Sequence, residues 1–164
     1  DFFELLSKKR FCSSTWLRSM ENLDYLEEPD MFHDTFGHVP LLCNPVFSKF
    51  MEAFGKLGVA MKEDAERVIQ LQRLYWFTIE FGLIHENTTK IYGAGIASSF
   101  GETNLSIGNT VEVATFDLKT ILNQTFETDH VQNLYFKIDS YEQLFEAIVA
   151  LEKEWKEKKL ITNL

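Results

Sequence analysis

"MFHDTFGHVP", residues 31–40, places two histidines five positions apart. On an unbroken α-helix, positions i and i+5 lie well apart around the axis, because one turn takes about 3.6 residues. Gly37 lies between them and tolerates the left-handed conformation common at helix C-termini, and Pro40 then disfavours a resumed helix. We therefore predict that a helix ends at Gly37, so that His33 projects from its last turn and His38 from the turn that follows.

A third residue that could act with this pair is Glu80, in the stretch YWFTIEFGLI (75–84). Its neighbours three or four positions away on a helix are all apolar, namely Trp76, Phe77, Leu83 and Ile84. A carboxylate is costly to bury among such side chains unless it is paired with a charge or coordinates a cation. An exposed position at a helix end and a buried salt bridge with an arginine are the alternatives.

Two imidazoles and one carboxylate form a facial set that leaves three coordination positions open on Fe(II). Zinc could use the same three ligands together with one water molecule. The spacing also fits a simpler interpretation, since a histidine is more often a structural hydrogen-bonding group than a ligand. The residues alone therefore indicate a candidate metal site at His33, His38 and Glu80 and leave the metal open.

The chain has 164 residues, of which 45% are hydrophobic, and this is enough for one domain with a buried core. Fifteen Phe, five Tyr and three Trp indicate that aromatic rings pack this core or line a pocket. The residue pattern predicts helices after Pro45, over 63–83, over 111–126 and from Ser140, and strands over 11–18 and 133–138. The glycine-rich stretch over 92–102 is expected to be a loop that leads into a short element. Gly55 and Gly58 should interrupt the helix after Pro45. The predicted fold class is mainly α with a small β component.

The net charge of −9 argues against a nucleic-acid or anionic membrane surface, since both require clustered Lys and Arg. The cysteines, Cys12 and Cys43, are too few for a disulfide framework, and neither a signal peptide nor a long apolar run is present. We therefore expect a cytoplasmic protein. The sequence starts without an initiator Met, which indicates either a processed chain or one whose earlier residues are absent.

Three longer stretches carry a family resemblance: EEPDMFHDTFGHVPLL (27–42), LYWFTIEFGL (74–83) and KIYGAGIASSFGE (90–102). In this order and at these separations they resemble the pterin-dependent aromatic amino acid hydroxylases, and most closely the bacterial phenylalanine 4-hydroxylases. The resemblance covers only the later part of the family's catalytic domain. Residues 1–164 are therefore expected to form the later part of a single catalytic domain of this type, with the front portion absent.

The resemblance implies a role for each matching position. His33, His38 and Glu80 fall on the family's iron ligands, and Tyr75 falls on a tyrosine close to the iron. Arg18 falls on the arginine that binds the carboxylate of the amino acid, a task suited to a bidentate guanidinium. The other implied positions are contacts with the substrate ring at Pro29 and Trp76, a pocket wall at Gly95 and Ser98, pterin stacking at Phe2, and an acidic residue near the pterin at Asp34. The serine also supports the first histidine ligand in the family. Glu102 matches a family glutamate.

The activity implied is that of a monooxygenase of phenylalanine catabolism, which uses Fe(II), tetrahydrobiopterin and O2 to convert L-phenylalanine to L-tyrosine. Such a site must hold an iron with open positions, exclude bulk water and fix the ring over the metal. Trp76 disfavours tryptophan as the substrate, because tryptophan-specific relatives tend to carry the smaller Phe there. The choice between phenylalanine and tyrosine stays open.

Two other functions are alternatives. The dipeptide HD at 33–34 is compatible with a zinc or di-metal hydrolase, which would need further His or Asp ligands that the sequence does not obviously supply. A non-catalytic relative could bind an amino acid as a sensor, although intact His33, His38 and Glu80 count against it. The chain has no heptad extension of the kind that tetramerises animal members of the family, so a monomer is expected.

Overall fold

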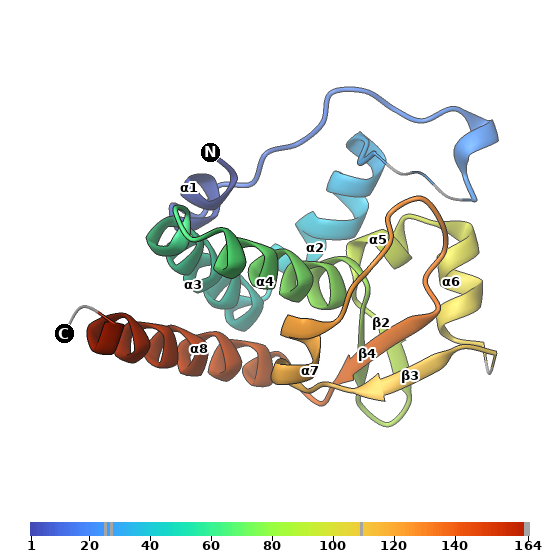
Figure 1. Cartoon of the computed structure of the whole chain (residues 1–164). Helices are drawn as coiled ribbons and strands as arrows, with labels where there is room; N and C mark the ends of the chain where they lie inside the picture. The colour runs from blue at the N-terminus through green and yellow to red at the C-terminus, as the bar shows by residue number, and fades with distance from the viewer. Residues whose placement is uncertain (25, 27, 109, 163–164) are drawn as a thin grey trace.

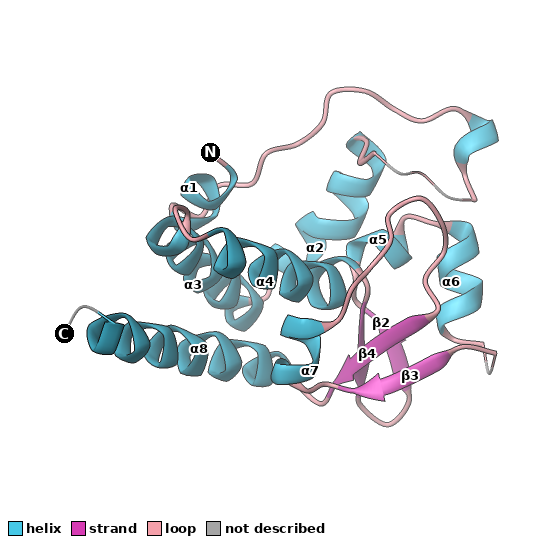
Figure 2. Ribbon diagram, viewed as in Figure 1, coloured by secondary structure: helices cyan, strands magenta, loops and turns pink. Residues whose placement is uncertain are grey.

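The computed structural model describes residues 1–24, 26, 28–108 and 110–162, which form helices around a small sheet (Figures 1 and 2). The prediction of a mainly α fold with a small β component is confirmed. In the part of the chain that the structure describes, every helix is too short or too polar to cross a bilayer. The α-helices are α1 (Phe2–Ser7), α2 (Val39–Leu42), α3 (Pro45–Met61), α4 (Ala65–Tyr75), α5 (Ala94–Ala97), α6 (Phe100–Ser106), α7 (Leu118–Asn123) and α8 (Tyr141–Thr162). The other helical segments are the 3₁₀-helix η1 (Met20–Asn22) and the π-helices η2 (His33–His38) and η3 (Trp76–Glu80).

Helix α3 is central to the helical part of the fold, because α1 and α8 both pack on it (Figure 1). Phe47, Phe50 and Phe54 project from α3 into the main hydrophobic core, where each is at most 1% exposed. Their rings lie edge-on or tilted to one another and to neighbouring tyrosines. The aromatic content of the sequence is thus used in part for this core, as predicted.

The prediction that Gly55 and Gly58 interrupt this helix is wrong, because α3 continues to Met61. Both glycines face α1 instead. A β-carbon on Gly55 would clash with the backbone nitrogen of Ser7, and one on Gly58 would clash with the ring of Phe3. The glycines therefore allow α1 to approach α3 closely, which outweighs their low helix propensity.

The sheet has four strands in the order β2-β1-β4-β3. Strand β1 pairs antiparallel with β2 and parallel with β4, and β3 pairs parallel with β4. In the register, Ile84 lies opposite Ile138, and Ala114 lies opposite Phe136. The strand predicted over 133–138 is confirmed as β4. The strands are β1 (Gly82–His85), β2 (Thr89–Ile91), β3 (Glu112–Thr115) and β4 (Leu134–Ile138).

The helix predicted over 111–126 is only partly present. Its first part is β3, which gains its hydrogen-bonding partner from β4, about 20 residues later in the chain. Asp117 then starts α7 by accepting a hydrogen bond at 2.7 Å from the backbone N–H of Thr120. Pairing with a distant strand therefore overrides the local apolar pattern in the first part of this segment.

The strand predicted over 11–18 is wrong, because this segment is extended but joins no sheet (Figure 2). Its backbone polar groups pair instead with the turn before η2. The Met31 N–H donates to the Trp16 carbonyl at 2.8 Å, and the Arg18 N–H donates to the Asp30 carboxylate at 2.8 Å. The Ser14 N–H donates to Asp34 at 2.6 Å. The segment is therefore held beside the residues that precede and begin η2.

Candidate metal centre and its pocket

The two histidines of the opening stretch lie on η2, a π-helical segment that continues into α2. The predicted helix end at Gly37 is therefore wrong. The N–H of Val39 donates to the carbonyl of Asp34 five residues earlier, the hydrogen bond that defines a π-helix. The wider turn brings residues five positions apart onto one face. His33 and His38 thus converge without any break in the helix.

Gly37 has a different task, which is to let α5 approach η2. A β-carbon at Gly37 would lie 2.8 Å from Cβ of Ala94.

The third candidate ligand, Glu80, ends another π-helical segment, η3, where the Phe81 N–H donates to the Trp76 carbonyl at 2.8 Å. Short π-helical segments are frequent at functional sites. Both segments that carry the three predicted ligands have this irregularity.

The three predicted ligands form one compact group, with their ligand atoms within 4.8 Å of one another. Nε2 of His33 lies 3.0 Å from Nε2 of His38. The Glu80 carboxylate lies 3.1 Å from the His38 nitrogen and 3.4 Å from the His33 nitrogen. Both imidazoles are buried, and the Glu80 side chain is 12% exposed. Among the described residues, neither cysteine belongs to this group.

Burial and mutual contact set the charges of the group. Burial lowers the pKa of His33, which favours the neutral imidazole. Burial opposes ionisation of Glu80, but His38, His33 and the Tyr75 hydroxyl outweigh it and hold the pKa of Glu80 below its ordinary value. Burial and the nearby Glu80 raise the pKa of Tyr75, so its hydroxyl stays protonated. The group therefore combines a carboxylate with a histidine that favours its neutral form.

This donor set fits a divalent metal ion. Nδ1 of His33 lies 2.8 Å from Oγ of Ser98, so the ring can donate there and keep Nε2 free as a ligand. Nε2 of His38 lies next to this free nitrogen of His33, so both could bind one metal ion. Two imidazole nitrogens and one carboxylate are ligands that Fe(II) and Zn(II) both accept. A cation at this point would coordinate atoms that otherwise crowd one another.

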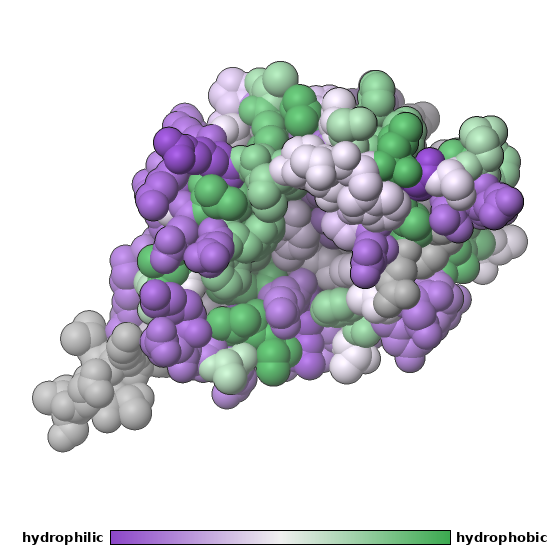
Figure 3. Space-filling view, turned by 90° about the horizontal axis from the view of Figure 1, so that it is seen from above, coloured by the Kyte–Doolittle hydropathy of each residue, from purple (hydrophilic) through white to green (hydrophobic). Residues whose placement is uncertain are grey.

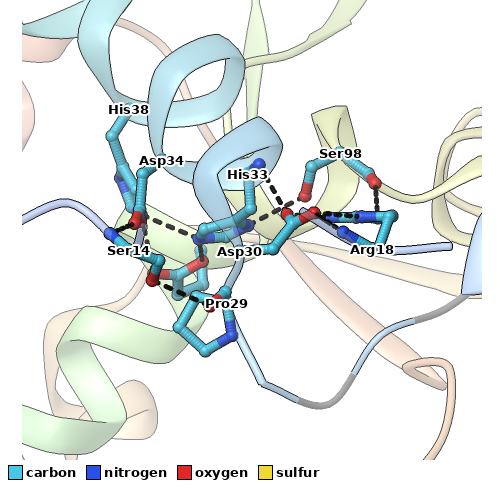
Figure 4. A network of polar contacts seen from close by, with 9 residues as sticks. Ser14, Arg18, Pro29, Asp30, His33, Asp34, His38 and Ser98 are labelled. Carbon is cyan, nitrogen blue, oxygen red and sulfur yellow. Dashed lines mark hydrogen bonds and ion pairs between the residues drawn. The ribbon is translucent and has the colours of Figure 1, made fainter. Parts of the chain in front are cut away.

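Arg18 lies beside this group in a network with Asp30 and Ser98 (Figure 4). Its Nε and Nη2 donate to the two carboxylate oxygens of Asp30 at 3.0 and 2.7 Å, and its Nη1 donates to the Ser98 carbonyl at 2.5 Å. Asp30 also accepts the N–H of His33 at 2.9 Å. Burial raises the pKa of Asp30, but the Arg18 guanidinium and the backbone N–H groups of His33 and Arg18 outweigh burial and hold that pKa well below its usual range. Arg18 keeps two of its five N–H groups for another partner.

A cavity of about 520 Å³ opens over the metal group. Seen from above, the surface is hollowed near its centre, with hydrophobic side chains around the depression (Figure 3). All five positions predicted to bind substrate line this cavity together with His33 and Glu80: Arg18, Pro29, Trp76, Gly95 and Ser98. Its walls are otherwise mostly aromatic or aliphatic. A small molecule with one ring and one carboxylate matches this lining in chemistry.

A second hollow of about 410 Å³ borders the same metal group on another side. It is lined by Phe2 and Asp34, the two positions predicted to bind the pterin, and by Tyr75. The Phe2 ring is 37% exposed and lies edge-on to Tyr75, with the ring centres 5.4 Å apart. Asp34 is 5% exposed and is fixed by the N–H of Ser14. His33 and Glu80 thus line both hollows, and His38 lines the second.

Sequence analysis missed the contributions of Asp30 and Gln132. Asp30 orients Arg18 by accepting from two of its guanidinium nitrogens. An aspartate one residue before a helix is a standard capping signal, so its bond to His33 could have been predicted. Gln132 contacts Trp76, which is 56 positions away in the sequence, and no local pattern indicates such a contact.

A family model described as biopterin-dependent aromatic amino acid hydroxylase matches residues 1–161. Over 148 residues the chain is 49% identical to a phenylalanine-4-hydroxylase of Chromobacterium violaceum, covering 89% of this chain and 50% of that protein. The fold matches that of the same organism's phenylalanine hydroxylase crystallised with iron(III) and 7,8-dihydrobiopterin, with a TM-score of 0.86 and 46% identity, over 96% of this chain and 58% of that one. A structure of that hydroxylase with iron and phenylalanine matches with a TM-score of 0.81 and 47% identity, over 89% of this chain and 53% of that one. The chain spans about half the length of the curated relatives it matches.

Proposed function

Since this chain belongs to the family of biopterin-dependent aromatic amino acid hydroxylases, we propose that it carries the metal and substrate sites of a phenylalanine 4-monooxygenase. The protein would hydroxylate the ring of L-phenylalanine with O2 to give L-tyrosine. One observation carries the proposal: His33, His38 and Glu80 converge at the floor of a cavity that also holds Arg18 and an aromatic wall. The likeness to phenylalanine hydroxylases at 49% and 46% identity supports the substrate.

We propose that His33, His38 and Glu80 hold Fe(II) through two nitrogens and one carboxylate. When bound, Fe(II) together with tetrahydrobiopterin supplies the electrons that activate O2. The residues of the chain fix the conditions for this chemistry. Three protein ligands leave coordination positions open. Ser98 fixes the His33 ring through Nδ1. The apolar walls of the cavity keep bulk water from the metal.

We propose that Arg18 receives the carboxylate of phenylalanine with the two N–H groups that Asp30 and Ser98 leave free. The ring would then lie against Trp76, with Pro29 and His33 on the other sides and Gly95 and Ser98 behind it. All of these residues line one cavity, which supports the placement. Charge recognition at one end and an apolar wall at the other would hold the ring over the metal.

The pterin would occupy the second hollow, where Phe2 offers an aromatic face and Asp34 a carboxylate. Tyr75 lines both hollows and hydrogen-bonds to Glu80, so it lies next to the reacting groups. A catalytic role of Tyr75 as an oriented hydroxyl beside the metal is part of the same proposal. This arrangement puts cofactor and substrate on different sides of one metal.

The alternative functions have less support. A di-metal hydrolase would need a second group of ligands beside the first. Among the described residues, the other group of three possible ligands lies at the surface, on the loop before β4, and consists of Glu127, Asp129 and His130. A non-catalytic amino-acid sensor would have no need of a compact metal group. Residues 1–164 as one catalytic unit, a cytoplasmic location and a monomeric state stay predictions.

The function is tested by loading the full-length protein with Fe(II) under anaerobic conditions and adding tetrahydrobiopterin, phenylalanine and ¹⁸O-labelled O2. We expect tyrosine that carries one labelled oxygen atom. Tyrosine and tryptophan are offered separately to rank the substrates. Iron-loaded protein that binds phenylalanine but forms no tyrosine would support the sensor alternative instead.

Arg18→Lys is expected to raise the KM for phenylalanine about 10- to 100-fold, because a lysine cannot form the bidentate pair with Asp30 and the substrate carboxylate at once. The KM for the pterin should change much less, since Arg18 lines only the larger cavity. Steady-state kinetics with each reactant varied in turn measure both constants. Equal changes in the two constants would show that Arg18 has only a structural role.

Trp76→Phe is expected to widen the ring pocket, because phenylalanine is smaller than tryptophan. Turnover of tryptophan should rise relative to that of phenylalanine by about 10-fold, the scale of a change of this size in an apolar pocket. Phenylalanine should also be held less firmly, so that more pterin is oxidised for each tyrosine formed. Product and oxidised pterin are measured in the same reactions. If the substrate preference and the ratio of tyrosine to oxidised pterin stay unchanged, Trp76 does not contact the substrate ring.

A further inference from the structure

The Trp76 side chain is held on three sides by other residues. Its indole stacks on Phe126 with ring centres 4.5 Å apart and planes at 15°, and it lies against Phe81 at 4.5 Å and 35°. Its Nε1–H donates to Oε1 of Gln132 at 3.0 Å. Phe126 and Gln132 come from the loop between α7 and β4, which is distant in sequence from η3. The position of the indole is therefore set by this loop.

The Gln132 side chain is itself fixed in orientation. It is 6% exposed, and its amide group donates to the carbonyls of Glu127 and His130, both at 3.0 Å. The amide oxygen accepts from Trp76, while the amide nitrogen donates twice. In a flipped amide, the NH2 group would point at the indole N–H, and the oxygen would point at the two carbonyls, so all three hydrogen bonds would be lost. Only one orientation satisfies the site. Gln132 thus links the fold of the loop to the position of Trp76.

Glu102 anchors the loop between α7 and β4 through hydrogen bonds to its carboxylate. It lies on α6 and is fully buried, and its Oε1 accepts the backbone N–H of Gln132 at 2.8 Å. Its other oxygen accepts the hydroxyl of Tyr135 in β4. Glu102 thereby ties α6, β4 and the loop together at the residue that holds the indole. It is the family glutamate to which sequence analysis assigned no role.

We propose that Gln132 is a positioning residue that sets the width of the substrate pocket through Trp76, and that Glu102 holds Gln132 in place. The inference rests on the proposed function for its effect on substrate, but the contact itself does not. Trp76 lines the cavity four positions before Glu80 on the same π-helical segment. A loosened indole would leave the substrate ring free to move away from the metal. Gln132 acts on the reaction only through this indole.

The test is a double-mutant cycle in the full-length protein, using Gln132→Met, Trp76→Phe and the pair. Gln132→Met keeps the length of the side chain and removes the acceptor. We expect the KM for phenylalanine to rise about 10-fold, because the indole N–H is left without a partner, and tyrosine per oxidised pterin to fall. The KM for the pterin should change less than about 2-fold. When Trp76 is already Phe, Gln132→Met should add less than about 2-fold, because no N–H remains to be held.

A structural role of the loop alone gives a different result. In that case Gln132→Met would act equally with and without Trp76, and the equal effects would overturn the proposal. Thr125→Ala, at an exposed position of the same loop, is the control and should leave both KM values within about 2-fold of wild type. If Gln132→Met does not fold, Glu102→Gln takes its place. It leaves one acceptor oxygen for two donors, so a smaller change in the same direction is expected.

A second measurement needs no turnover. The indole N–H signal of Trp76 is identified in ¹H–¹⁵N spectra as the signal that Trp76→Phe removes. Gln132→Met should shift this signal and speed its exchange with water, whereas Thr125→Ala should leave it in place. An unmoved signal in Gln132→Met would overturn the proposal even if the enzyme is active. If Gln132→Met shifts the signal but the wild-type protein forms no tyrosine, the contact is supported and the proposed function is rejected.

Discussion

Glu80→Gln is expected to lower the affinity for Fe(II) by at least about 100-fold and to reduce tyrosine formation to background at limiting iron. Glutamine has nearly the same shape but replaces the one anionic ligand with a neutral amide. Even partners that only orient a ligand change metal affinity by about 10- to 100-fold, and Glu80 belongs to the ligand group itself. Iron content after dialysis against a weak chelator, together with tyrosine formation, measures the effect.

The matched control is His85→Ala, which removes an exposed histidine at the end of β1, five residues from Glu80. It should keep the iron content and the rate of the wild-type protein. Added Fe(II) should also raise the unfolding temperature of the wild-type protein and of His85→Ala, but not that of Glu80→Gln, because a ligand stabilises only the state that binds it. Full iron occupancy in Glu80→Gln would mean that the metal is held elsewhere.

The grouping of His33, His38 and Glu80 was predictable from the sequence for a physical reason. A carboxylate among apolar helix neighbours needs a partner, and the structure supplies two imidazoles within 3.4 Å. The residues alone could not choose between iron and zinc, because both accept this ligand set. The family resemblance made that choice. Local chemistry thus indicated which side chains would lie together and left the metal open.

The geometry behind that group was predicted wrongly. A spacing of five was interpreted with α-helical periodicity, which required a helix end at Gly37. The π-helical turn removes this requirement, and Gly37 is needed instead for the close approach of Ala94. The π-turn could not be predicted locally, because Ala94, the residue that packs on Gly37, lies far along the chain. Gly55 in α3 shows the same effect, because its reason lies in the neighbouring helix.

The sheet and the pocket wall were less predictable because their partners are distant in the chain. The segment from Glu112 to Thr115 is a strand only because β4 lies beside it. Trp76 was placed in the pocket by resemblance, but nothing local to it indicates Phe126 or Gln132. Similarly, the segment over 11–18 is extended as expected for a strand, yet it pairs with side chains rather than with a sheet. Contacts of this kind require the folded structure.

Asp30→Asn is expected to lower the free energy of unfolding by about 3–5 kcal/mol, the cost of leaving a buried charge without its partner. Arg18 is 9% exposed and Asp30 is fully buried, so water cannot replace the lost carboxylate. Asparagine keeps one oxygen that can accept the N–H of His33. It has no negative charge and only one acceptor oxygen, so it cannot accept hydrogen bonds from both Nε and Nη2 of Arg18 as the aspartate does. Binding of phenylalanine should weaken as well, because the guanidinium loses its fixed orientation. Denaturant unfolding and calorimetric titration with phenylalanine measure the two effects.

Acid should reduce the stability difference between wild type and Asp30→Asn. Because the pKa of Asp30 is held well below its ordinary value, its ionised form stabilises the fold above a pH of about 4, and this contribution is lost as the pH falls further toward the folded-state pKa. The difference in unfolding free energy should therefore be constant from pH 7 to 5 and decrease from about pH 4 downward. Asp117→Asn is the control, since Asp117 caps α7 but is exposed, and asparagine caps a helix equally well. A stability difference for Asp30→Asn that is as small as that for Asp117→Asn, or that does not change in acid, would show that the Arg18–Asp30 pair does not stabilise the fold.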